Sequence, residues 1–587
     1  MKKELEHALH LCVSGQFGKA KKIYLELVEK KFQHFEIFAN LALIYLKENN
    51  LSEAEHNATK AIRLKKDPNQ LDILVSIKRR QGKSKEAMKI NELHDHSNNS
   101  YIINKVNILR ELGMFKESKE ISINLINKGG GSENLLINLG LIANLEKDFV
   151  TAKKYFEEVI KKNEASIEAQ YNLSITFYNL KKYHDSIHIL KNIKNTQYLH
   201  YQINKLLALN YQKIEEHANA KEIWELLKKD FNFIEIYLAL GKIAVEQGNL
   251  IDAINEYQAA IKINPSNWIG NFRLGEIYLK LSQWEKGFDL IRWAIKEQDH
   301  FIDDLTINKI DSSKLIIYAD QGIGDEIFYI RLLNKINTKS YKSIKVIADK
   351  RMISMYKKNF PDFNFMQKLE TEHYHNDELK INLSTLGRIF IKSDADVEMI
   401  NHQFIIDENK LNDFDELIKL KTKNKIVGIS WKSNNNAIGE KKSIKLRTLF
   451  TKTKNLKNLI YVNLQYGDVS DEIKELEKEF NINIITLSFD LYNDFDNLFY
   501  LIKLCDFIIT TSNINAHIAG ILNKKTFVLL PINSSRLWYW GLNNQLKTKW
   551  YPSLCLINQD KDGDWNSCVE KLYYQINKCI SDNKLVI

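Results

Sequence analysis

Two glycines and a carboxylate, Gly322, Gly324 and Asp325, lie between a short apolar run that ends at Asp320 and a stretch with helical character. The glycines let the backbone approach a ligand closely, and a carboxylate is stabilised at the positive N-terminus of a helix. The segment therefore fits a ligand-binding loop. A simple N-cap role for Asp325 accounts for the same residues, and the segment alone does not decide between the two.

A lysine with hydroxyl neighbours follows a second apolar run. Lys432 and Ser433 come directly after residues 425–431, and a polar loop then leads to Ser443. A lysine at the end of a strand can contact phosphate oxygens as a point charge. A surface lysine in a solvated loop explains the pattern equally well.

Hydroxyl and amide side chains, Ser512 and Asn513, stand between the apolar runs 506–512 and 525–531, and His517 follows about one helical turn later. Serine and asparagine commonly cap helices. The same helix start also suits a pyrophosphate, because its free N–H groups point at the ligand. His517 is compatible with either a packed or a functional histidine.

The elements that must position these residues are short, continuously apolar runs separated by helical stretches such as 468–480. Runs of this length suit strands buried on both faces of a parallel sheet, and their alternation with helices predicts an α/β architecture. A break at 405–424 divides them into two Rossmann-like lobes, 301–410 and 411–587, with a cleft between. The predicted strands are 314–320, 343–349, 425–431, 458–465, 483–489, 506–512 and 525–531.

Residues 1–300 carry a repeat. A short polar turn, an apolar residue and then a small residue recur every 31 to 34 positions, which resembles the tetratricopeptide repeat and predicts an α-solenoid of about nine repeats. The concave face of such a solenoid usually binds a protein segment; a spacer or dimerisation arm is the alternative. The small residues are Ala20, Ala54, Ala87, Ser118, Ala152, Ser186, Ala220, Ala253 and Gly287.

Composition excludes several classes of protein. A net charge of +10 over 587 residues, with acidic and basic residues interleaved, is too small and too dispersed for a dedicated nucleic-acid binder. Five scattered cysteines without a CxxC motif indicate a reduced, cytoplasmic setting rather than a disulfide framework or zinc ribbon. The N-terminus lacks the apolar core of a signal peptide, and no apolar run reaches the length of a membrane span.

From about residue 314 to 575 the chain resembles the bacterial tetratricopeptide-repeat glycosyltransferases related to glycosyltransferase family 9, the heptosyltransferases, and among them the type that glycosylates flagellin and other proteins. The resemblance rests on DQGIGDEIFYIRLL, VGISWKSNNNAIGEKKSIKL, VNLQYG, the long segment from NDFDNLFYL to KTFVLLP, LWYWG and the tryptophan-containing segment that follows it. It implies a GT-B fold with a nucleotide-sugar donor and no bound metal or other cofactor. The absence of a DxD motif at a strand end agrees, and His373 and His375 form no evident metal site.

The resemblance also implies roles for particular residues. Asp325 matches the proposed general base, which takes a proton from the acceptor hydroxyl. Lys432 neutralises the departing diphosphate, and the helix start from Ser512 through Asn513 to His517 donates hydrogen bonds to the same oxygens. Gln465 and Gly467 line the nucleotide, while Gly322 and Gly324 let the backbone approach the donor.

We therefore expect a cytoplasmic glycosyltransferase whose protein acceptor, such as flagellin, is recruited by the concave face of the repeats. Two alternatives stay open. One is a transferase that acts on a lipid-linked or polysaccharide acceptor, and the other is a non-catalytic repeat scaffold with a degenerate transferase domain. The sequence predicts neither the sugar, nor the base of the nucleotide, nor the oligomeric state.

Overall fold

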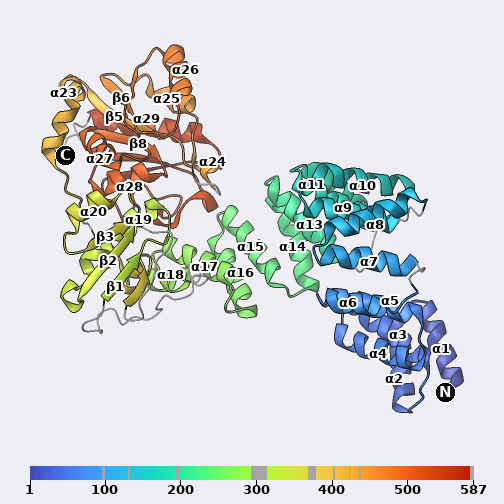
Figure 1. Cartoon of the computed structure of the whole chain (residues 1–587). Coiled ribbons are helices and arrows are strands. Elements are labelled where there is room, and N and C mark those ends of the chain that lie inside the picture. The colour runs from blue at the N-terminus through green and yellow to red at the C-terminus, as the bar shows by residue number, and fades with distance from the viewer. Residues whose placement is uncertain are drawn as a thin grey trace. The chain divides into compact units, whose positions relative to one another are not determined.

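The computed structural model describes residues 1–95, 99–129, 133–193, 199–292, 314–367, 378–400, 403–421, 423–434 and 438–581 (Figure 1). Close contacts divide the chain into two compact units, Met1–Phe231 and Asn232–Ile587. His373 and His375 lie outside the described residues.

Paired helices make up the first unit and the beginning of the second. Each helix contacts the next within its unit, as expected of stacked helical hairpins. The first unit contains α1 (Lys2–Val13), α2 (Phe17–Glu29), α3 (Phe35–Lys47), α4 (Leu51–Leu64), α5 (Pro68–Arg80), α6 (Ser84–Asn91), α7 (Asn99–Glu111), α8 (Phe115–Asn127), α9 (Glu133–Leu145), α10 (Phe149–Lys162), α11 (Ile167–Asn179), α12 (Tyr183–Asn192), α13 (His200–Lys213) and α14 (His217–Asp230). The second unit begins with α15 (Ile234–Glu246), α16 (Leu250–Ile263), α17 (Trp268–Lys280) and α18 (Trp284–Ile291).

The periodic small residues are buried, which confirms the repeat. The eight alanines and serines of the series are 0% exposed, and Gly287 is buried as well. Ser118 and Ser186 fit where the other repeats have alanine because each hydroxyl donates to a carbonyl oxygen of the preceding helix, Val106 and Ser174 respectively, at 2.8 Å in both cases. Small side chains are required because the paired helices cross closely at these positions.

Glycines let the backbones of α17 and α18 approach each other closely. A Cβ atom on Gly275 would lie 2.9 Å from the carbonyl oxygen of Gly287 and 3.0 Å from the backbone nitrogen of Ile291, and backbone atoms cannot move aside cheaply. We expect Gly275→Ala to lower the free energy of unfolding of the second unit by about 1–3 kcal/mol, as overpacked cores do. Chemical denaturation measures this. Gly18→Ala in α2 is the control, since nothing lies within 4 Å of its Cβ position, and an equal loss there would contradict the explanation.

Two parallel sheets form the remainder of the second unit. One has the strand order β3-β2-β1-β4 and the other the order β10-β9-β8-β5-β6-β7. The strands are β1 (Lys314–Tyr318), β2 (Ser343–Ala348), β3 (Asn364–Gln367), β4 (Glu378–Asn382), β5 (Lys425–Ser430), β6 (Leu459–Asn463), β7 (Ile484–Ile485), β8 (Phe507–Thr511), β9 (Thr526–Leu530) and β10 (Leu554–Asn558).

Helices connect these strands, as the alternating pattern predicted. The longer ones are α19 (Ile323–Ile330), α20 (Ile353–Asn359), α23 (Asp415–Lys421), α25 (Leu446–Thr453), α26 (Ser470–Phe480), α27 (Phe495–Leu504), α28 (Ile514–Ile521) and α29 (Trp565–Ser581). The shorter ones are α21 (Thr385–Phe390), α22 (Asp394–Glu398) and α24 (Gly439–Lys442), together with the 3-10 turns η2 (Arg331–Lys335), η3 (Thr338–Ser340), η4 (Glu408–Phe414), η5 (Asn533–Ser535) and η6 (Trp538–Trp540).

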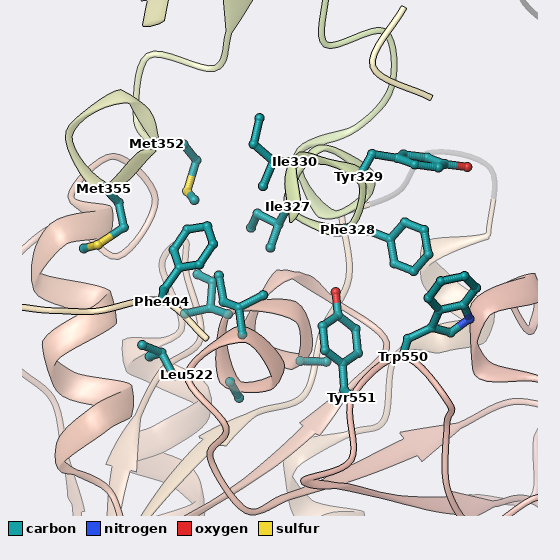
Figure 2. Packing of buried hydrophobic residues seen from close by; sticks show 14 of the residues in the cluster. Ile327, Phe328, Tyr329, Ile330, Met352, Met355, Phe404, Leu522, Trp550 and Tyr551 are labelled. Atoms are coloured by element: carbon teal, nitrogen blue, oxygen red, sulfur yellow. The ribbon is translucent and has the colours of Figure 1, made fainter. Parts of the chain in front are cut away.

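A single apolar core joins the last repeat helices to both sheets. It contains Trp284 and Phe288 of α18, Phe328 of α19 and Trp550 of the C-terminal segment. Figure 2 shows Phe328 facing Trp550, with their ring centroids 4.6 Å apart. The end of the repeat array is therefore built into the α/β unit.

Candidate functional site

The order of the strands places two topological switch points in the α/β unit. In the first sheet the chain leaves β1 toward β2 on one side and later returns to pair β4 on the other, and β5 is flanked in the same way by β6 and β8. Ligands of open α/β sheets bind outside the carboxyl ends of the strands at such points. The predicted site residues follow β1, β5, β6 and β8, which are the strands that form these points.

Asp320 holds the first switch point together. Its carboxylate accepts hydrogen bonds from the backbone nitrogen of Ser384 at 3.1 Å and from the Ser384 hydroxyl at 2.6 Å. Ser384 follows β4, so these bonds tie the end of β4 to the end of β1. Burial raises the pKa of Asp320 above its usual range.

Asp325 lies in the first turn of α19, and its side chain is partly exposed. The helix is preceded by Gly322 and has no side-chain cap, so Asp325 is not an N-cap. Burial among protein atoms raises the pKa of its carboxyl to about 6; the positive charge of Lys442 opposes that rise, and the negative charges of Asp320 and Glu276 add to it. A carboxyl with this pKa is suited to accept a proton near neutral pH.

His517 on α28 packs against the same loop. A Cβ atom on Gly324 would lie 3.3 Å from its Nε2 atom, so the first turns of α19 and α28 meet where Gly324 has no side chain. The Nδ1 atom of His517 is hydrogen-bonded to the Tyr551 hydroxyl at 2.9 Å. Burial, together with the charges of Arg331 and Lys442, lowers the pKa of His517 to about 3, so its ring is neutral at physiological pH.

Arg331 is a buried cation behind this histidine. Its Nη1 atom donates to the carbonyl oxygen of Trp550 at 3.0 Å, and its guanidinium lies 4.4 Å from the centre of the Tyr551 ring. Its Nη2 atom is buried and has no hydrogen-bond partner among the described residues. Burial lowers the pKa of Arg331. The positive charge of Arg331 therefore opposes protonation of the nearby His517 ring.

Gln465 and Asn513 join the strand ends at the second switch point. The Oε1 atom of Gln465 accepts hydrogen bonds from the backbone nitrogens of Trp431 at 2.9 Å and Lys432 at 2.8 Å. The Nδ2 atom of Asn513 donates to the Ser430 hydroxyl at 2.7 Å and to the carbonyl oxygen of Lys432 at 3.1 Å. Both side chains thus shape the backbone around β5.

Ser512 and Gly467 complete the set of predicted residues. The Ser512 hydroxyl accepts a hydrogen bond from Trp540 Nε1 at 2.8 Å, which attaches η6 to the end of β8. Gly467 follows β6 with φ +85°, a conformation that side-chain-bearing residues rarely adopt, and nothing lies within 4 Å of its Cβ position. The backbone there is open to an approaching molecule.

The two lysines of this region have different surroundings. The Lys432 ammonium forms a 2.5 Å ion pair with Glu472, whose carboxylate also accepts from Trp431 Nε1 at 3.2 Å. Lys442 is only 4% exposed, and burial lowers its pKa to about 8, although the Asp325 charge opposes that shift. The charge of Lys442 acts on both Asp325 and His517, and that of Arg331 also acts on His517.

Sequence reasoning did not single out Lys442. It stands in a segment with three lysines, Lys441, Lys442 and Lys445, that are alike in type, and only its burial sets it apart. Its position before the apolar residues Ile444 and Leu446, which enter the core, was the available signal. No group of three or more histidine, cysteine or acidic side chains is placed to hold a metal ion within the parts of the chain that the structure describes.

Comparisons with known proteins identify the helical array. Residues 35–68 match a family described as tetratricopeptide repeat, and residues 241–282 match another described as TPR repeat. These helical pairs are tetratricopeptide repeats. The two matches fall in different compact units, one at α3 and α4 and the other at α15 to α17. Tetratricopeptide repeats commonly bind protein segments on their concave face.

Similar proteins cover parts of the chain. Protein FlbA of Caulobacter vibrioides is 27% identical over 140 residues, or 24% of this chain, and the match spans 23% of FlbA itself. A tetratricopeptide-repeat protein from Parabacteroides merdae is 20% identical and covers 41% of this chain and 97% of its own, with a TM-score of 0.30. YrrB, a tetratricopeptide-repeat protein with an unusual peptide-binding site, is 16% identical and covers 31% of this chain and 95% of its own, with a TM-score of 0.26.

No helix among the described residues is both long enough and apolar enough to span a bilayer. All five cysteines are free thiols.

Proposed function

We propose that the chain is a cytoplasmic glycosyltransferase of the GT-B type, which transfers a sugar from a nucleotide-sugar to a protein acceptor recruited by its tetratricopeptide repeats. The observation that carries this proposal is the meeting of α19 and α28. It brings Asp325 from the first switch point near His517 and Lys442 from the second lobe. A base and a buried cation at one junction are what glycosyl transfer from a diphosphate requires.

Each side chain then has a task in the transfer. The Asp325 carboxylate takes the proton of the acceptor hydroxyl while the acceptor oxygen forms a bond to the anomeric carbon. The bond between that carbon and the diphosphate oxygen breaks, and the nucleoside diphosphate leaves with the electron pair. The Lys442 ammonium stabilises the charge that develops on the diphosphate, because an ammonium is worth more in a desolvated site than in water.

The other predicted donor residues have supporting roles. Gln465 and Asn513 hold the backbone of the second switch point, and the open backbone at Gly467 offers room for the nucleotide. Lys432 would have to leave Glu472 to reach a phosphate, so its predicted role in binding the diphosphate is secondary to that of Lys442. Flagellin is the acceptor to test first, since the resemblance is to flagellin-glycosylating transferases.

A thermal-shift screen against nucleoside diphosphates and nucleotide-sugars tests donor binding. At 100 times its dissociation constant, a ligand should stabilise the protein by about 2.7 kcal/mol. We expect Lys442→Met to weaken the best ligand about 10- to 100-fold, because a charge-assisted hydrogen bond in a buried site is lost. Titration calorimetry gives the dissociation constants.

Lys441→Met is the matched control for this substitution. The Lys441 ammonium pairs with Asp562 at 3.2 Å, and its side chain is 40% exposed, so its loss should leave donor affinity unchanged. Equal weakening by both variants would contradict the role given to Lys442. A complete lack of nucleotide binding in the wild-type chain would favour the non-catalytic scaffold.

A further inference from the structure

A cavity of about 420 Å³ lies where the last tetratricopeptide repeats meet the C-terminal lobe. One wall comes from the turn between α15 and α16, with Val245, Leu250 and Ile251, and from Lys280 at the end of α17. The opposite wall is Asn533 and the segment 541–544. Its volume is in the range of ligand-binding pockets, and none of the residues assigned to donor binding or catalysis lines it.

Hydrogen bonds fix the two walls relative to each other. Asn533 Nδ2 donates to the carbonyl oxygen of Glu246 at 2.6 Å, and the Ser534 hydroxyl donates to the Glu246 carboxylate at 2.6 Å. The Lys280 ammonium donates to the carbonyl oxygen of Asn533 at 3.2 Å. The cavity therefore lies within one compact unit, between the last repeats and the segment that follows β9.

The walls combine apolar surface with the positive charge of Lys280. Ile251 is 74% exposed although it lines the cavity, and Val245, Leu250 and Leu542 add apolar area around it. Among the described residues, no carboxylate forms an ion pair with Lys280. Burial and the charges of Arg536 and Arg273 lower its pKa to about 8, with Glu276 and Glu246 opposing.

A second cation without an acidic partner stands behind this wall. Arg536 is 2% exposed, and its guanidinium donates to the carbonyl oxygen of Gly541 at 2.7 Å and to the carbonyl oxygen of Trp540 at 2.5 Å. A further donor of Arg536 bonds the side-chain oxygen of Asn558, which is also neutral. Burying a charge without an opposite charge is costly, and an anion that enters the cavity would relieve that cost.

We propose that this cavity binds a segment of the acceptor polypeptide that carries an acidic side chain next to an apolar one, the acid on Lys280 and the apolar group against Ile251. The assignment rests on the proposed function in naming the ligand as the acceptor. A peptide fits better than a nucleotide because the lining combines aliphatic side chains with amides and contains no aromatic side chain to stack on a base. The exposed amide of Asn544 can both donate to and accept from a peptide backbone.

Direct selection of peptides by the full-length chain tests the inference without any transfer reaction. The probe is a display library of random twelve-residue peptides, and fluorescence anisotropy then gives the dissociation constants of the selected peptides. We expect selected peptides to share an acidic residue beside an apolar one. Lys280→Gln and Ile251→Asp should each weaken their binding about tenfold or more.

Two surface variants serve as controls. Ile263 is 39% exposed at the end of α16 and Lys286 is exposed on α18, and neither lines the cavity, so Ile263→Asp and Lys286→Gln should leave binding unchanged. The inference is overturned if no common pattern is selected, or if selected peptides bind Lys280→Gln as tightly as the wild type. It is also overturned if Ile251→Asp instead dissociates a dimer, or if nucleotides compete for the cavity in a Lys280-dependent way. Binding that persists in Asp325→Asn keeps this result separate from the fate of the proposed transferase activity.

Discussion

Replacing Asp325 by asparagine should lower the rate of sugar transfer by about 10²- to 10⁴-fold, the range that a general base contributes. The amide is close in size to the carboxylate but cannot take the proton of the acceptor hydroxyl. The measurement is transfer of labelled sugar to flagellin by the wild type and the variant. The Asp471→Asn variant is the control, because Asp471 is an exposed carboxylate in the first turn of α26, outside the site.

The pH dependence follows from the same carboxyl group. Only ionised Asp325 can act as a base, and its pKa is about 6, so the rate should rise with pH up to about 6 and then level off.

The stability of the fold should change with pH in the opposite direction to the rate. The pKa of Asp325 in the folded chain is above the usual value near 4, which means that folding disfavours ionisation of this carboxyl. The resulting loss of stability develops between about pH 4 and pH 6 and persists above. Asp325→Asn should therefore melt at a higher temperature than the wild type at pH 8. A variant that keeps its activity, or loses both activity and fold, would contradict the assignment.

Removing the Phe288 side chain should lower the free energy of unfolding of the α/β unit by about 3–5 kcal/mol, although this residue belongs to a repeat helix. Phe288 is 2% exposed, and its ring lies 5.7 Å from that of Trp538 and 6.5 Å from that of Tyr329, measured between centroids. It also fills the space beside Gly387, where an added Cβ would lie 2.6 Å from the ring. Chemical denaturation of Phe288→Ala measures the loss, and donor binding reports whether the α/β unit is still folded.

Phe156→Ala and two truncations complete that experiment. Phe156 is 0% exposed in α10 of the first unit, so its removal should destabilise that unit and leave donor binding intact. A chain that begins at residue 232 should fold and bind the donor, whereas one that begins at 301 loses Trp284 and Phe288 and should not fold. If the shorter chain folds normally, the shared core is not essential. The chain that begins at 232 also tests recruitment. It keeps the cavity beside Lys280, so a protein-directed transferase should lose only the acceptor selection that the first unit supplies, whereas a glycan-directed one should keep its acceptor selection unchanged.

Much of this fold could be predicted from the sequence, because positions that are buried at regular intervals carry small or apolar residues at the same intervals. The small residues of the repeats mark helix crossings, and each predicted run from 314–320 to 525–531 contains an observed strand. The strands that sequence reasoning missed are β3, β4 and β10, and all three lie at sheet edges. An edge strand needs no apolar residues on both faces, so a search for continuous apolar runs finds neither β3, in which only Phe365 is buried, nor β4, which contains Lys380. β10 is itself an apolar run, LCLIN, and its position at a sheet edge does not explain why it was missed.

The candidate site was only partly predictable for a different reason. Residue type indicated Asp325, Gly324 and His517, and the fold brings them together. Type could not show that Lys432 is paired with Glu472 while Lys442 is buried, since ion pairing and burial depend on residues far away in the chain. It also could not show that the side-chain oxygen of Gln465 accepts hydrogen bonds from the backbone of Trp431 and Lys432, which follow another strand.

The division of the chain at Phe231 has a consequence for how such proteins diversify. The apolar core of the sheets includes residues of α17 and α18, the last repeat helices of the second unit. Insertion, loss or exchange of whole repeats before this point would change the part of the array to which the proposed function assigns acceptor recruitment, without changing the candidate site around Asp325. Under the proposed function, the repeats of the first unit could therefore be exchanged to recruit different acceptors, whereas α17 and α18 have to be kept because the sheets pack against them.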